Sequence, residues 1–184
     1  GRPTRVTPLY EPLKQAGALY GDTFGWERAK WYAAKGEKEN YSFRRNNSFA
    51  AVAEECKAVR ERVGLTDLTS FSKYEVSGKD AQGFLERLCA NRVPTKAGGI
   101  VLSQMLTEKG GIESEATIAC LAENHYYLLS AAVAELHDFD WLVQHIQKGE
   151  GVSVTNVTED FGVLLLTGPL SRDVLSILTE TNLS

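Results

Sequence analysis

The clearest pattern in the sequence is an apolar stripe that predicts a helix over about residues 49–63. Apolar side chains recur there at helical spacing, so they share one side: Phe49, Val52, Ala53, Cys56, Val59 and Val63. Gly64 follows, and glycine often ends a helix because it tolerates a left-handed backbone. We therefore expect a helix that packs by this stripe and stops at Gly64.

The pattern then changes to an alternation of two, which is typical of strands. A strand is expected at 74–77, and a short helix begins after Asp80 with one apolar face. Strands over 100–106 and 112–121 are joined by a turn at Gly110–Gly111. A third strand over 125–130 continues them, so this part predicts an antiparallel meander.

Further elements complete the pattern toward the end of the sequence. A helix is expected over about 133–148, strands near 152–157 and 161–167, and a last helix after Pro169. Hairpins mixed with crossing helices predict an α+β fold, with a mostly antiparallel sheet and helices packed on one face. The last helix has no following partner, which suggests that the sheet is incomplete.

The opening residues, 1–47, differ in composition because they are rich in aromatic residues, proline and glycine. We expect an extended arm with at most a short helix near 10–16. The segment Phe24–Tyr32 could stack on a planar ligand. The favoured interpretation is an arm that packs against a neighbouring domain.

Composition narrows the function classes. The 184 residues are 43% hydrophobic and 24% charged, with a net charge of −4, which gives no support for nucleic-acid binding. No apolar run approaches the roughly 20 residues of a membrane span. The three cysteines and three histidines lack metal-ligand spacing, so no metal site or disulfide framework is expected. The cytoplasm fits best, with an organelle matrix such as that of mitochondria as the alternative.

The hairpin after Gly110–Gly111 carries the candidate chemistry. In a regular strand, Glu113 and Glu115 share a face with Thr117 and Ala119. Two carboxylates beside small residues leave space for a ligand, and a partly buried carboxylate can exchange a proton near neutral pH. A solvent-facing sheet edge explains the same pattern, and the pattern alone favours that simpler explanation. No dinucleotide or phosphate-binding glycine motif is present.

Several segments, in the same order along nearly the whole chain, resemble the folate-binding part of dimethylglycine and sarcosine dehydrogenases. They are Arg5–Tyr10, Phe24–Arg28, Trp31–Tyr32, Val63–Leu68, Tyr74–Gly78, Gly110–Ile112, Glu135–Asp138 and Leu166–Pro169. The later ones also resemble the glycine-cleavage T-protein, or aminomethyltransferase. The Gly-Trp-Glu-Arg arm favours the dehydrogenases.

The resemblance implies a two-part enzyme. A preceding flavin domain, with FAD, oxidises an N-methyl amine, and the folate domain captures the one-carbon unit as 5,10-methylenetetrahydrofolate. Residues 1–47 would then be a linker from the flavin domain, and residues 48–184 the first part of the folate-binding domain. A small barrel domain would follow. The chain is thus expected to be a fragment of a longer protein, and to be inactive alone.

The resemblance also implies site residues. The family's catalytic Asp corresponds to Glu115, whose carboxylate lies one methylene farther out. The folate contacts correspond to Phe71, Leu102, Thr117 and Ala131, where Leu102 replaces a usual Tyr and Ala131 a usual Asn.

Three alternatives share the fold. They are a non-catalytic relative like the regulatory subunit of pyruvate dehydrogenase phosphatase, a free aminomethyltransferase of glycine cleavage, and a folate-dependent demethylase.

Overall fold

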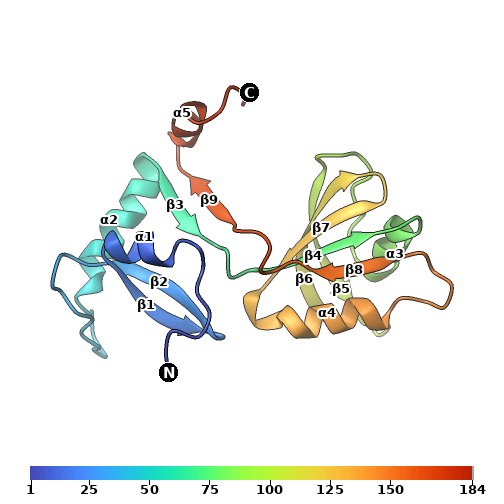
Figure 1. Cartoon of the computed structure of the whole chain (residues 1–184), viewed down its shortest axis with the longest axis horizontal. Helices are drawn as coiled ribbons and strands as arrows, with labels where there is room; N and C mark the ends of the chain where they lie inside the picture. Colours follow the sequence, from blue (N-terminus) through green and yellow to red (C-terminus); the bar gives the residue numbers. More distant parts are fainter. Residues whose placement is uncertain (184) are drawn as a thin grey trace. The chain divides into compact units, whose positions relative to one another are not determined.

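The computed structural model describes residues 1–183, and the chain divides into two compact units. Unit 1 consists of Gly1–Ser70 and the segment from Gly162 onward, and unit 2 is the continuous stretch Phe71–Phe161. Figure 1 shows the strands and helices of each unit. All five predicted site residues belong to unit 2.

Unit 2 is built on a five-stranded, fully antiparallel sheet with the strand order β5-β6-β7-β4-β8. The strands are β4 (Ser72–Ser77), β5 (Ile100–Leu106), β6 (Ile112–Ala122), β7 (His125–Ser130) and β8 (Ser153–Asn156). The helices are α3 (Ala81–Leu88), the 3-10 turn η1 (Ala132–Ala134) and α4 (Glu135–Gln144). The predicted meander and its helices are therefore confirmed, with boundaries shifted by a few residues.

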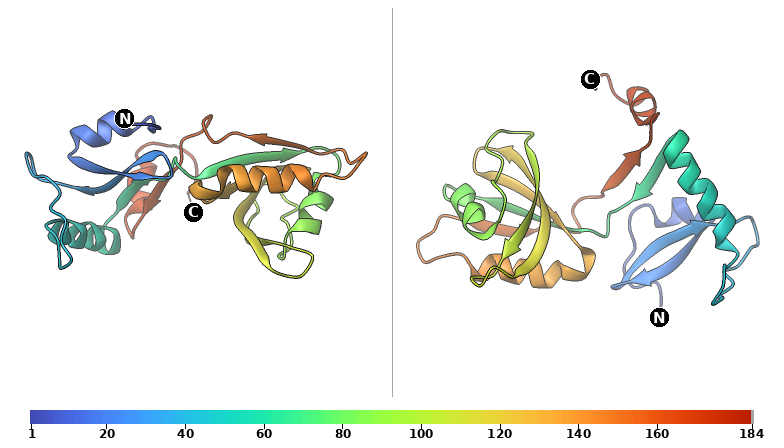
Figure 2. Two further views of the ribbon diagram at one scale, coloured as in Figure 1. Left: turned by 90° about the horizontal axis from the view of Figure 1, so that it is seen from below. Right: turned by 180° about the vertical axis from the view of Figure 1, so that it is seen from behind.

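One face of this sheet is buried against helices and is called the dry face below; the opposite face is called the open face. Alternate residues of β6, such as Ala116 and Ile118, are at most 2% exposed. They pack in one cluster with Phe84 of α3 and Leu142 of α4, so both helices cover the same face. Figure 2 shows α4 running along that side of the sheet. The α+β class with helices on one face is confirmed, and the other face carries the predicted site residues.

Unit 1 corrects the expected extended arm. After the short helix α1 (Tyr10–Gln15), β1 (Ala18–Thr23) and β2 (Trp26–Tyr32) form an antiparallel hairpin. Trp26 and Trp31 are 4% and 3% exposed, so they form the core of this unit. The prediction of an irregular arm was wrong because the turn at Phe24–Gly25, both with positive φ, was not recognised as a hairpin turn.

The remaining elements of unit 1 are α2 (Ser48–Glu61), β3 (Gly64–Asp67), β9 (Leu164–Thr167) and α5 (Ser171–Ser176), with β3 and β9 paired antiparallel. The predicted helix is present, but Phe49 and Val52 on its apolar stripe are 50% and 37% exposed. Gly64 does not cap α2; it is the first residue of β3. Helical spacing predicted the helix correctly, while burial of its stripe depends on a partner that spacing does not identify.

Candidate functional site

The strand register brings the predicted site residues together on the open face of the unit 2 sheet. Leu102 of β5 lies opposite Thr117 of β6, and Thr117 lies opposite Leu129 of β7. Two residues further along β6, Glu115 lies in the next row. Rows on one face are about 7 Å apart along a strand, and neighbouring strands are about 4.8 Å apart. The two rows are therefore close enough for one ring system to contact both.

The second row is completed by the predicted residues at the strand ends. Ser72 pairs with Ser130, so Phe71 and Ala131 follow one step beyond the paired strands. The Ser72 hydroxyl donates to the Ala131 carbonyl at 3.0 Å and fixes the end of β7. Continuing the β6–β7 register places Ala131 beside Glu115. The five residues chosen from the resemblance thus lie in two neighbouring rows.

Glu115 has a direct partner that sequence reasoning missed. Gln104 stands opposite it in the register, and the Gln104 Nε2 donates to Glu115 Oε2 at 2.6 Å. The Glu115 side chain is exposed, and among the described residues its Oε1 has no hydrogen-bond partner. The carboxylate is therefore held at one oxygen and presents the other to the open face.

Beyond Gln104, the same face of the sheet is apolar over β5 and more enclosed toward β4. Leu102 and Ile100 are 54% and 69% exposed on the open face. At the β4 end, Lys73 is fully buried, and its ammonium donates to the Phe71 carbonyl at 3.0 Å. Phe161 covers Tyr127 of β7 edge-on, with ring centroids 6.0 Å apart. The accessible part of the face therefore lies over β5 and β6.

Glu113 does not share this face, which corrects the predicted pair of carboxylates. Met105 pairs with Ser114 and Leu106 with Ile112, so Glu113 is the extra residue of a β-bulge. Its Oε1 lies 2.8 Å from His137 Nε2 on α4. Because α4 covers the dry face, Glu113 and Glu115 have different surroundings. A two-residue alternation cannot reveal a bulge, and this explains the error.

Other candidate chemistry in unit 2 is weak. Burial raises the pKa of the Cys89 thiol to about 11, so it stays protonated and is a poor nucleophile. No group of three or more His, Cys, Asp or Glu residues with metal-binding geometry exists within residues 1–183. None of the helices formed by those residues is both long and apolar enough to cross a membrane.

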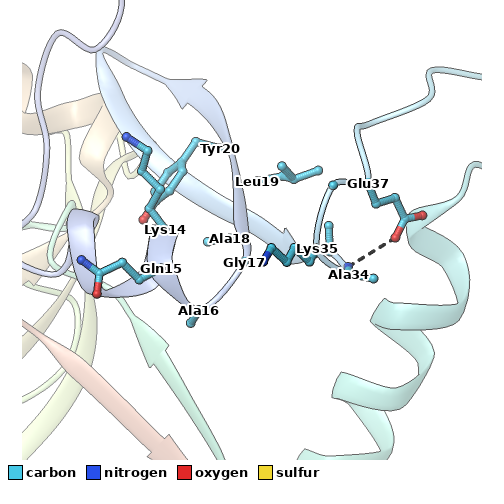
Figure 3. Close-up of a pocket in the computed structure, with 12 residues that line it drawn as sticks. Lys14, Gln15, Ala16, Gly17, Ala18, Leu19, Tyr20, Ala34, Lys35 and Glu37 are labelled. Atoms are coloured by element: carbon cyan, nitrogen blue, oxygen red, sulfur yellow. Dashed lines mark hydrogen bonds between the residues drawn. The ribbon is translucent and has the colours of Figure 1, made fainter.

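Unit 1 contains a depression of about 760 Å³ beside α1 and β1, shown in Figure 3. Its rim carries Lys14 and Glu37, and Glu37 accepts a hydrogen bond from the backbone N–H of Ala34 at 3.4 Å. None of the predicted site residues lines it.

The hypothesis that the segment Phe24–Tyr32 stacks on a ligand is not supported for its two tryptophans, which are buried.

The fold is that of a domain of the aminomethyltransferase type. A solved glycine cleavage system aminomethyltransferase T from Bartonella henselae has the same fold, with a TM-score of 0.78 and 26% identity over 95% of this chain and 43% of its own. The chain belongs to the family described as the GCVT N-terminal domain, which matches residues 9–184. The predicted family is thereby confirmed.

Longer relatives extend the match to the whole chain. The mitochondrial dimethylglycine dehydrogenase of Rattus norvegicus is 38% identical over 188 aligned residues, covering 100% of this chain and 22% of its own length. The mitochondrial pyruvate dehydrogenase phosphatase regulatory subunit of Mus musculus is 31% identical over 97% of this chain and 21% of its own. The chain therefore spans about a fifth of these relatives.

Proposed function

We propose that the open face of the unit 2 sheet binds tetrahydrofolate. In this proposal the chain serves an FAD-dependent dehydrogenase of dimethylglycine or sarcosine, in which the bound folate captures the released one-carbon unit as 5,10-methylenetetrahydrofolate. The observation that carries the proposal is the grouping of Glu115, Leu102 and Thr117 in two adjacent rows on the uncovered face. The family and the dehydrogenase relatives support it.

The residues on this face fit a planar ligand with polar edges. Leu102 and Ile100 supply exposed apolar surface on which a ring can pack. Thr117 adds a hydroxyl that can donate or accept, and Phe71 supplies an aromatic ring at the end of the second row. The Glu115 carboxylate is the charged group within this set. We expect the folate to lie across β5 and β6, with its reacting amine toward Glu115.

Glu115 is the proposed catalytic residue. Bound tetrahydrofolate supplies the nucleophilic amine nitrogen that takes up the one-carbon unit. The Glu115 carboxylate would accept the proton that this amine loses, and its negative charge would stabilise positive charge next to it. Gln104 holds one carboxylate oxygen and leaves Oε1 for the proton. The longer Glu side chain, relative to the family's Asp, places this oxygen farther from the strand.

The parts of the parent protein outside this chain complete the proposal. A flavin domain would precede residues 48–184, with 1–47 as its linker, and a barrel domain would follow; this division remains a prediction. Three free cysteines fit a reducing compartment. The similar dehydrogenase and regulatory subunit are mitochondrial proteins, which favours the matrix over the cytoplasm for this protein.

A non-catalytic regulatory role is the second candidate. Glu115 replaces the family's Asp, Leu102 replaces a Tyr and Ala131 an Asn, so part of the expected polar pocket is missing. The 31% identity to a phosphatase regulatory subunit supports this second candidate. A free aminomethyltransferase or a folate-dependent demethylase would use the same face on another substrate.

The test uses the full-length protein with Glu115→Gln and the control Glu108→Gln, which changes an exposed carboxylate at the hairpin turn. Calorimetric titration measures tetrahydrofolate binding, and trapping of 5,10-methylenetetrahydrofolate measures capture. We expect wild type and Glu108→Gln to bind and capture. Glu115→Gln should bind but lose capture by about 10²-fold or more.

Two outcomes would contradict the proposal. If wild type does not bind tetrahydrofolate, the regulatory role is favoured. If Glu115→Gln captures the one-carbon unit as well as wild type does, Glu115 has no catalytic role.

A further inference from the structure

The hairpin that carries Glu115 extends beyond the sheet. The last pairing of β6 with β7 is Thr117 with Leu129. From Ala116 back to Ile112, β6 pairs only with β5. On its other edge β5 is bridged at Met105 by Cys89, whereas the β7-facing edge of β6 from Ile112 to Ala116 has no strand partner among the described residues. Glu115 lies within this overhanging segment, two residues from the last three-stranded row.

The turn and the core impose conflicting registers on this ribbon. The turn pairs Leu106 with Ile112, and regular counting from there would place Ser103 opposite Glu115. The core requires a register shifted by one residue, because Ala116 and Ile118 are buried on the face that packs against the helices. The extra residue Glu113 reconciles the two, and Gln104 rather than Ser103 then faces Glu115. The bulge therefore accounts for the orientation of Glu115 within a tightly closed hairpin.

A chain of ionisable groups holds the bulge. Glu113 Oε1 lies 2.8 Å from His137 Nε2, and His137 Nδ1 lies 2.9 Å from Asp138 Oδ1. Asp138 is fully buried, and its Oδ2 has no hydrogen-bond partner among the described residues. A doubly protonated imidazole donates to both carboxylates at once, which suits a histidine between two acids. These contacts, which we call the Glu113–His137–Asp138 clip, connect the unpaired edge of β6 to α4.

We propose that Glu113 and His137 are positioning residues for Glu115. The clip anchors the overhanging end of β6 to α4, keeps the bulge at residue 113, and so holds the Glu115 carboxylate on the open face against Gln104. Neither positioning residue touches the open face, so they act through the strand. The effect on one-carbon capture rests on the proposed function, whereas the anchoring itself does not.

Glu113→Ala is the direct test, because it leaves the buried Asp138–His137 contact in place. Glu113→Gln keeps an oxygen that can accept from His137, and Glu108→Ala removes an exposed carboxylate from the same hairpin as the control. Hydrogen exchange of the amides of residues 112–116 is measured by NMR in the chain. We expect about tenfold faster exchange in Glu113→Ala. Glu113→Gln should recover most of the protection, and Glu108→Ala should match wild type.

Activity of the full-length protein gives the second measurement. Glu113→Ala should lower kcat for one-carbon capture by roughly 10–10²-fold with little change in the KM for tetrahydrofolate, because the face remains and the carboxylate is misplaced. Glu113→Gln should recover kcat. Unchanged exchange in Glu113→Ala would overturn the clip. Faster exchange with unchanged kcat, while Glu115→Gln is inactive, would overturn the positioning role alone.

Discussion

At the scale of single residues, His137 is the group whose charge the fold sets most directly. Hydrogen bonds that its ring donates, first to Asp138 and then to Glu113, raise the pKa of His137 above its usual value. The carboxylates in contact with its ring are Glu113 of β6, at 2.8 Å, and Asp138 of α4, at 2.9 Å. The side chain is 49% exposed, so solvent screens these interactions and their contribution to stability is small.

The raised pKa of His137 gives a pH dependence with a definite sign. Protonated His137 stabilises the folded state, so this contribution is complete below the ordinary pKa of about 6.5 and is lost as pH rises through the folded pKa. We expect the stability of unit 2 to decrease slightly over that window. NMR titration of the His137 ring measures the pKa. Hydrogen exchange of β6 amides, corrected for intrinsic rates, measures the stability.

His125→Gln is the matched control for this pH dependence. His125 lies 3.3 Å from Glu75 on the same sheet, and this contact does not involve the bulge at Glu113. The variant should keep the pH dependence that Glu113→Ala weakens. A His137 pKa at or below 6.5 would show that the two carboxylates do not hold the proton.

At the scale of elements, the connection from β4 to α3 depends on one glycine. Gly78 has φ +122°, and an added Cβ would collide with the backbone oxygen of Gly151. Gly83, inside α3, has open space at its Cβ position. Gly78→Ala should destabilise unit 2 by roughly 2–4 kcal/mol, because it adds both strain and a backbone clash. Gly83→Ala should stabilise it by about 0.5–1 kcal/mol.

The two glycine variants are compared by hydrogen exchange of β6 and β7 amides, which reports on unit 2 directly. If Gly83→Ala destabilised unit 2 as much as Gly78→Ala does, the backbone conformation at residue 78 would not be the reason that a glycine is required there.

The elements also show what sequence patterns can and cannot predict. The hairpin from Ile100 to Leu121 was predictable because alternation and the Gly110–Gly111 turn agree. The bulge at Glu113 was not, because it is set by competition between the turn, the buried residues of β6 and His137, which is distant in sequence. For the same reason Gln104, the partner of Glu115, was missed. Exposure of the α2 stripe also depends on tertiary partners rather than on spacing.

At the scale of the whole molecule, the two units have different cores. Unit 2 has a continuous apolar cluster between its sheet and two helices. The buried apolar side chains of unit 1 are chiefly Ala18, Trp26 and Trp31 of its hairpin. The family and the fold class were predictable from the order of motifs along the chain. The division into units was not, because unit 1 joins residues from both ends of the sequence.

Binding of tetrahydrofolate to the open face of the unit 2 sheet is tested most directly by one calorimetric comparison. Leu102→Arg places a bulky charge on that face, and Leu136→Arg places the same group on α4, where Leu136 is 73% exposed. In the full-length protein we expect Leu102→Arg to weaken tetrahydrofolate binding by at least about tenfold, while Leu136→Arg binds like wild type. Equal affinity of both variants and wild type would contradict the claim.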